Sequence, residues 1–105
     1  MNINIKNKVV TIVGLGRSGI ASAQLAMQLG ATVKVSDTAS LEKVQGSLAG
    51  TGLEKQLTIE SGQHTKAFIQ TSDVVVLSPG VRADALPVIW AKEKGIPVLG
   101  EIEFA

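Results

Sequence analysis

Three glycines near the start of the chain have the types and spacing of a diphosphate-binding loop. The apolar residues 9–13 lead into Gly14, Gly16 and Gly19, which form a G-x-G-x-x-G pattern. After a buried strand, the first glycine permits a tight turn, the second lets backbone approach a phosphate, and the third lets a helix lie close to the strand. Unpaired N–H groups in the first turn of that helix attract an anion. The pattern therefore predicts diphosphate binding, although such turns also serve packing alone.

Two kinds of charged side chain accompany the glycines. Asp37 follows Gly14 by 23 positions (37 minus 14), close to the roughly 20 at which an acid on the next strand contacts the group that the diphosphate carries. A solvated acid or a helix N-cap is the alternative for Asp37. Arg17, inside the motif, and Arg82, farther along, could each face a phosphate or lie on the surface. We expect Asp37 and Arg17 to contact the ligand.

A second loop of similar chemistry follows the apolar residues 74–77. Ser78 offers a hydroxyl, Pro79 fixes the turn, and Gly80 permits close backbone approach. The same three residues could also end a strand without binding anything.

The hydrophobic pattern of the whole chain alternates between strand and helix periods. It predicts strands at 8–13, 31–36, 57–60, 73–77 and 96–99, with helices at 17–29, 40–48, 65–70 and about 83–94. Short connections between them imply right-handed crossovers. We therefore predict a single α/β domain with a Rossmann-like, doubly wound, mainly parallel five-stranded sheet. The glycine loop, Asp37 with Thr38, and the 78–80 loop should meet beyond the carboxyl ends of its strands.

Composition excludes several classes of site. The 105 residues carry a formal charge of +1 without a basic cluster, so we expect no nucleic-acid partner. No cysteine is present and only one histidine, His64, so no thiolate or His-cluster metal site is expected. The apolar run at 9–15 is too short to span a membrane, and we expect a soluble, cytoplasmic protein without a membrane partner.

The chain also lacks recognisable catalytic motifs. The sequence contains no G-x-x-x-x-G-K-[ST] loop, H-E-x-x-H, G-x-S-x-G or cysteine nucleophile. His64 has no evident partner and is predicted to be a surface loop residue, whereas Trp90 is predicted to lie in the core. We expect no catalytic residue in this chain.

Four segments together resemble the N-terminal domain of the Mur ligases that join D-glutamate to UDP-N-acetylmuramoyl-L-alanine. The match extends over the whole chain, and the S-P-G-V and G-E-I-E-F sequences distinguish it from a generic dinucleotide motif. The segments are residues 14–19, 35–38, 76–81 and 95–104.

The resemblance implies the first domain of a three-domain ligase of peptidoglycan synthesis. Residues 1–105 would be the UDP-substrate-binding domain, a fragment that is inactive alone and binds neither ATP nor Mg²⁺. In the whole enzyme, ATP and Mg²⁺ convert the alanyl carboxylate into an acyl phosphate that D-glutamate attacks. The partners of the domain at residues 1–105 would be UDP-N-acetylmuramoyl-L-alanine and the central and C-terminal domains of the same enzyme.

The resemblance also assigns roles by position. The uracil would be hydrogen-bonded by Asp37 and Thr38. Some relatives follow these residues with a basic side chain, where this chain has Ala39. The diphosphate loops would comprise Gly14, Gly16, Arg17, Ser18, Gly19, Ser78, Pro79 and Gly80.

Two other functions fit the same glycine motif. One is the NAD(P)-binding domain of an oxidoreductase or of a redox-sensing regulator, in which Asp37 would bind the adenosine ribose hydroxyls. The other is a Rossmann-like interaction module that binds no nucleotide. The Ser78-Pro79-Gly80 loop favours the ligase over the first alternative, and Asp37 argues against the second.

Overall fold

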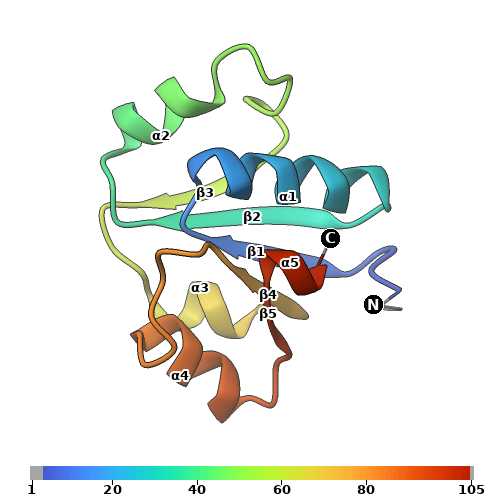
Figure 1. Cartoon of the computed structure of the whole chain (residues 1–105), viewed down its shortest axis with the longest axis vertical. Helices are drawn as coiled ribbons and strands as arrows, with labels where there is room; N and C mark the ends of the chain where they lie inside the picture. The colour runs from blue at the N-terminus through green and yellow to red at the C-terminus, as the bar shows by residue number, and fades with distance from the viewer. Residues whose placement is uncertain (1–3, 105) are drawn as a thin grey trace.

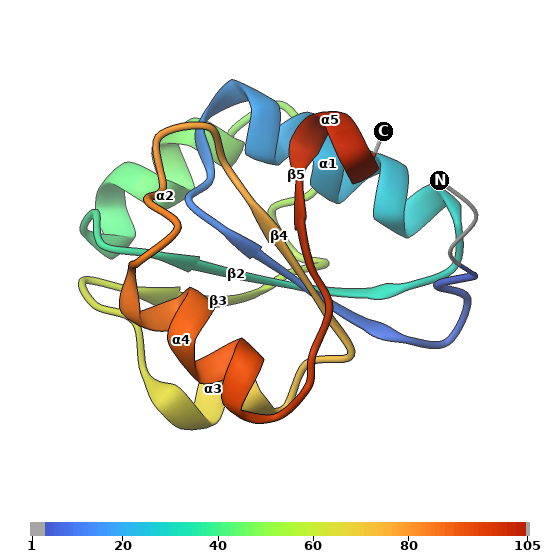
Figure 2. The same ribbon diagram turned by 60° about the horizontal axis from the view of Figure 1, so that its bottom comes forward.

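Five parallel strands form one sheet between two layers of helices (Figures 1 and 2). The computed structural model describes residues 4–104, without the side chains of residues 102 and 103. The strand order is β3-β2-β1-β4-β5, so the direction of the crossovers reverses between β1 and β4. The bounds of the strands are β1 Val9–Val13, β2 Thr32–Asp37, β3 Thr58–Ser61, β4 Val74–Leu77 and β5 Val98–Gly100. The predicted doubly wound fold is confirmed, and every pairing is parallel.

The helices cover both faces of the sheet. In Figure 2, α1, α2 and α5 lie on one side of the strands and α3 and α4 on the other. Their bounds are α1 Gly16–Gln28, α2 Leu41–Leu48, α3 Lys66–Gln70, α4 Leu86–Glu93 and α5 Glu101–Phe104. Helix α2 begins as the sequence predicts, because the Ser40 side chain accepts a hydrogen bond from the Lys43 N–H at 3.2 Å.

Helices α4 and α5 differ most from the sequence prediction. Helix α4 begins at Leu86 rather than near Ala83. Pro87 has no N–H to donate to a carbonyl four residues earlier, so it fits only in the first turn of a helix. Helix α5 was not predicted, because four residues are too few to show a helical period.

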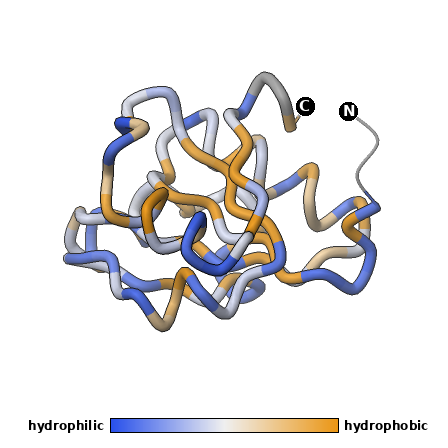
Figure 3. Tube along the Cα trace, turned by 90° about the horizontal axis from the view of Figure 1, so that it is seen from below, coloured by the Kyte–Doolittle hydropathy of each residue, from blue (hydrophilic) through white to orange (hydrophobic). Residues whose placement is uncertain are grey.

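The core is divided by the sheet into two apolar clusters. Ile12, Val35 and Val76 belong to the larger cluster, beneath α1 and α2, and Val13 and Val75 belong to the smaller one, against α3 and α4. Neighbouring residues of one strand thus face opposite layers, as the pleat requires. The apolar segments gather at the centre of the trace, and the polar ones follow its outer turns (Figure 3).

The strand register brings the loops of interest to one edge. Val13 of β1 pairs with Ser36 of β2 and with Leu77 of β4. Asp37 pairs with Ser61 of β3 in turn. The carboxyl ends of these four strands are therefore level, and the segments that follow them lie side by side.

Candidate functional site

The glycine loop is a tight turn between β1 and α1. Gly14 has a φ of +82°, a left-handed conformation that glycine adopts without strain, and its N–H donates to the Ser36 carbonyl at 2.9 Å. Gly19 lies against this turn, since a Cβ built on it would be 2.7 Å from the Gly14 carbonyl oxygen. A Cβ on Gly16, in contrast, would meet nothing within 4 Å. Gly16 also has a positive φ, of +44°, so all three glycines shape the loop, and the second additionally leaves its outer side open.

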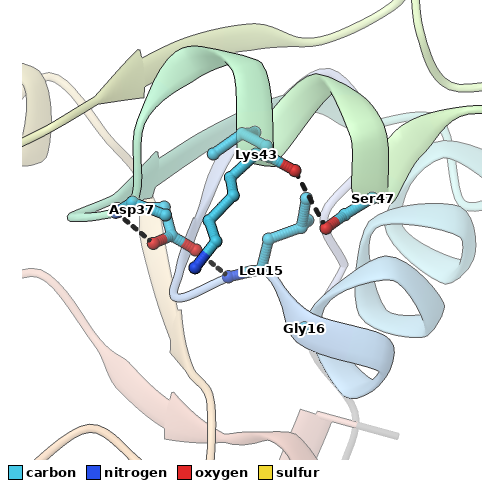
Figure 4. A pocket seen from close by; sticks show the side chains of 7 residues that line it. Leu15, Gly16, Asp37, Lys43 and Ser47 are labelled. Carbon is cyan, nitrogen blue, oxygen red and sulfur yellow. Dashed lines mark hydrogen bonds between the residues drawn. The ribbon is translucent and has the colours of Figure 1, made fainter.

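Asp37 holds the loop from the neighbouring strand. One carboxylate oxygen accepts the Leu15 N–H at 2.8 Å and the other accepts the Ala39 N–H at 2.8 Å (Figure 4). The side chain thus joins the turn after β1 to the turn after β2. Each carboxylate oxygen has two lone pairs, so Asp37 retains acceptor capacity for a ligand. The helix that follows is capped by Ser40 rather than by Asp37.

The first turn of α1 presents backbone donors to solvent. Gly16, Arg17 and Ser18 are exposed, and no acidic side chain lies in this turn. The first N–H groups of a helix have no partner within it, and the helix dipole adds a partial positive charge there. Such an end suits an anion of the size of a phosphate.

The loop after β4 closes onto the glycine loop. The Ser78 hydroxyl donates to the Gly14 carbonyl, and the Val81 N–H donates to the Ser78 carbonyl at 3.0 Å, which makes a turn. Gly80 is exposed, and a Cβ on it would meet nothing within 4 Å. The two glycine-containing loops are therefore joined through Ser78, while Pro79 and Gly80 extend outward.

Two pockets open beside these loops. The smaller, of about 170 Å³, lies between the glycine loop and α2, and the Lys43 side chain extends from α2 toward the Asp37 carboxylate (Figure 4). The larger, of about 610 Å³, lies between the segments that follow β2 and β3 and the segment that follows β4. Its lining residues are Thr38, Gly62, Gln63, His64, Gly80, Val81, Arg82, Ala85, Leu86 and Pro87.

Four of the ten site residues predicted from the sequence line one of these two pockets. Gly16 and Asp37 line the smaller pocket, and Thr38 and Gly80 line the larger. The other six predicted residues lie outside both pockets. Gly14, Gly19 and Ser78 form the junction of the two loops, whereas Arg17, Ser18 and Pro79 are exposed beside it.

His64 corrects one sequence expectation. It was predicted to be a surface residue without a partner, but it is half-buried and its Nδ1 lies 2.6 Å from the Ser36 hydroxyl. Burial lowers the pKa of His64 below its ordinary value of 6.5, and this outweighs the Glu60 and Asp37 carboxylates, which raise it. The signal that could have found it is its position three residues after β3, at the edge where ligands bind.

Leu86 and Pro87 of the larger pocket were also missed. Leu86 is 57% exposed and forms part of the pocket wall with Pro87. These two residues show no local motif, so only the fold brings them to the pocket. Arg82, which the sequence offered as a possible phosphate contact, lines the pocket but is paired with Asp84, the distance from Nε to the carboxylate being 2.9 Å.

Residues 4–104 contain neither a cluster of metal-ligating side chains nor a membrane-spanning helix. No group of three or more His, Cys, Asp or Glu side chains there could hold a metal ion. No helix in the same range is long and apolar enough to cross a membrane.

A family model described as the N-terminal domain of MurD-like Mur ligases matches residues 8–100. The chain belongs to this Mur ligase family. It is 41% identical over 103 residues to a UDP-N-acetylmuramoylalanine–D-glutamate ligase of Koribacter versatilis, and the match covers 98% of this chain and 22% of that ligase. The chain thus spans about a fifth of the length of this relative. The resemblance inferred from the four sequence segments is confirmed.

The fold of this Mur ligase domain is shared with solved structures of low identity. A UDP-N-acetylmuramate–alanine ligase of Thermotoga maritima aligns with a TM-score of 0.70 at 20% identity, over 93% of this chain and 22% of that one. A D-lactate dehydrogenase of Lactobacillus jensenii, solved with NAD⁺, aligns with a TM-score of 0.53 at 23% identity. The alignment covers 78% of this chain and 21% of the dehydrogenase. These two likenesses concern the fold alone.

Proposed function

We propose that this domain binds the UDP end of UDP-N-acetylmuramoyl-L-alanine in a cytoplasmic ligase that adds D-glutamate during peptidoglycan synthesis. The observation that supports this most strongly is the family match over residues 8–100, together with the name of the 41% identical relative. The convergence of the two glycine-containing loops at one edge of the sheet gives the proposal a physical basis.

The diphosphate would lie at the amino end of α1. Gly16 leaves room for close approach, Arg17 and Ser18 are exposed, and the N–H groups in the first turn of a helix have no partner within it. Gly80 offers a second open stretch of backbone. The exposed Arg17 side chain would add a positive charge that can pair with the diphosphate oxygens.

The uracil would be recognised by Asp37 and Thr38. Asp37 is fixed by its two backbone hydrogen bonds, so a ligand would meet a carboxylate of defined orientation. Ala39 offers no cation where some relatives have a basic side chain. Lys43 lines the smaller pocket with Asp37 and Ala39, so its positive charge would lie beside the Asp37 carboxylate.

The role of the domain would be to position the substrate. Binding energy from the unreacting nucleotide end can hold a distant carboxylate in place for reaction. By the family resemblance, ATP, Mg²⁺ and catalysis would belong to other parts of the ligase.

Calorimetric titration with UDP-N-acetylmuramoyl-L-alanine, UDP and NAD⁺ tests this proposal. We expect both UDP compounds to bind, and Thr38→Val to weaken UDP by about fivefold, the loss of one hydrogen bond. Thr38 is exposed, so this substitution should leave the fold intact. Thr32→Val, at an exposed position at the opposite end of β2, is the matched control. Preferential binding of NAD⁺ would refute the proposed UDP site.

A further inference from the structure

A network of polar side chains connects β2 and β3 beneath the larger pocket. Ser36, which is fully buried, contacts both the Glu60 carboxylate at 2.7 Å and His64 Nδ1 at 2.6 Å. Glu60 also accepts the Thr65 N–H at 3.1 Å and the Thr65 hydroxyl. Glu60 is therefore an acceptor for three hydrogen bonds.

The protons in this network fix the tautomer of His64. A carboxylate has no proton to donate, so the Ser36 hydroxyl must donate to Glu60. Ser36 has a single hydroxyl proton, and its oxygen must then accept from His64. Nδ1 of His64 therefore carries the ring proton, and in the neutral imidazole Nε2 is a bare acceptor.

Nε2 of His64 is the atom available to a ligand. It makes no hydrogen bond to another described residue, and it is not among the buried unpaired polar atoms, so it reaches solvent. His64 lines the larger pocket with Thr38 and Arg82. The lowered pKa of His64 agrees with a neutral ring, although Glu60 and Asp37 nearby favour the protonated form.

We propose that His64 is a specificity-determining residue that accepts, at Nε2, a hydrogen bond from an N–H or O–H group of the nucleoside. This inference rests on the proposed function, and it names the part of the ligand that enters the larger pocket. A uridine offers three such donors, the imide N–H of the base and the two ribose hydroxyls. Phosphate oxygens are mainly acceptors, so a bare Nε2 would not attract them.

The wall opposite His64 has the chemistry of a heterocycle-binding surface. Val81, Ala85, Leu86 and Pro87 give it apolar surface against which a flat ring can lie. Thr38 and His64 supply polar groups on the other side. The pocket thus combines an apolar face with few directional hydrogen bonds, which is the usual arrangement of a small-molecule site.

NMR of the whole chain tests the tautomer directly, because His64 is its sole histidine. Long-range ¹H–¹⁵N correlations distinguish a protonated ring nitrogen from a bare one. At about pH 7.5, above the ordinary histidine pKa, we expect Nδ1 to be protonated and Nε2 bare. A neutral ring protonated at Nε2 would overturn the proposal.

Titration with UDP to about 10 mM, enough to reveal a millimolar Kd, tests the contact. We expect the ¹⁵Nε2 resonance of His64 to shift together with the amides of Gly16, Arg17 and Ser18. Shifted amides with an unchanged Nε2 would refute the role of His64 and leave the proposed function standing. If neither moves, the proposed function fails and this inference fails with it.

A pair of variants separates binding from folding. His64→Asn keeps a donor at the position of Nδ1 for Ser36 but has no atom at the position of Nε2, whereas His64→Gln reaches that position with an amide. We expect His64→Asn to weaken UDP by about fivefold, His64→Gln to restore part of the affinity, and inorganic pyrophosphate to bind equally to all three proteins. Equal UDP affinity of wild type and His64→Asn would contradict the proposal.

Analogues identify the donor. N3-methyl-UDP lacks the imide N–H, and 2′-deoxy- and 3′-deoxy-UDP each lack one ribose hydroxyl. The analogue without the group that His64 binds should lose affinity for the wild type and be insensitive to His64→Asn. If His64→Asn weakened all three analogues as much as UDP, no nucleoside donor would meet Nε2 and the proposal would be wrong.

Discussion

Gly19→Ala tests whether the contact between α1 and the turn after β1 determines the shape of the glycine loop. The added Cβ would lie 2.7 Å from the Gly14 carbonyl oxygen, where ordinary contacts begin at 3.4 Å. The neighbouring atom belongs to the backbone, so the clash is relieved only if α1 or the loop moves. The same carbonyl accepts the Ser78 hydroxyl, and a shift would therefore reach the loop after β4.

The expected magnitude follows from two opposing effects. Overpacking in a well-packed interior costs about 1–3 kcal/mol. Alanine is favoured over glycine within a helix by about 1 kcal/mol, which offsets part of this cost. We expect a net loss of about 1 kcal/mol in the free energy of unfolding, or about 4–8 °C in Tm for a domain of this size.

Urea unfolding followed by circular dichroism measures the change. Gly46→Ala is the matched control, because Gly46 lies exposed in α2 and a Cβ on it would meet nothing within 4 Å. This control should stabilise the domain by about 0.5–1 kcal/mol. If Gly19→Ala stabilised the domain as much as Gly46→Ala does, the close contact would have no energetic weight and the reasoning would be refuted.

Two further predictions concern buried polar groups. The lowered pKa of His64 means that the unfolded chain binds a proton first as the pH falls below about 6.5, so stability that is present above this pH is lost below it. The urea midpoint of the wild type should therefore fall more between about pH 7.5 and about pH 5.5 than the midpoint of His64→Gln. An equal fall in the two midpoints would disprove this prediction. The buried hydroxyls of Thr11 and Ser72 lie 2.5 Å apart and form a hydrogen bond. Thr11→Val should lower the free energy of unfolding by about 1–3 kcal/mol, and the double variant with Ser72→Ala should lose less than the sum of the two single variants. Strict additivity of the two losses would exclude the pairing.

The order and type of most elements were predictable from the sequence, most clearly for β1 and β4, which are short apolar runs followed by turn residues. Val33 and Val35 alternate with Lys34, which correctly indicated two faces of β2. The pattern could not reveal that Lys34 is half-buried against α3, where Nζ donates to the Phe68 carbonyl at 2.6 Å. Such a partner is 34 positions away along the chain, and only the crossover brings it near.

The candidate site was predictable where a glycine or an acid has a local reason for its position. Gly14 needs a left-handed φ, and Asp37 ends the neighbouring strand. The larger pocket was not predictable, because its wall comes from the first turn of α4 and its polar side from the segment after β3. His64 shows the difference clearly. Its ring is oriented by a buried serine 28 positions earlier, which no local pattern indicates.

The central position of β1 has a consequence for how the chain is made. Its partner β4 begins at Val74, which pairs with Val10 across 64 residues (74 minus 10). A ribosome that adds about 5–20 residues per second needs about 3–13 s to make that stretch. During this time one edge of an apolar strand has no partner, and unpaired strand edges promote association with other chains. The nascent domain therefore exposes this edge of β1 until residue 77 has left the ribosome.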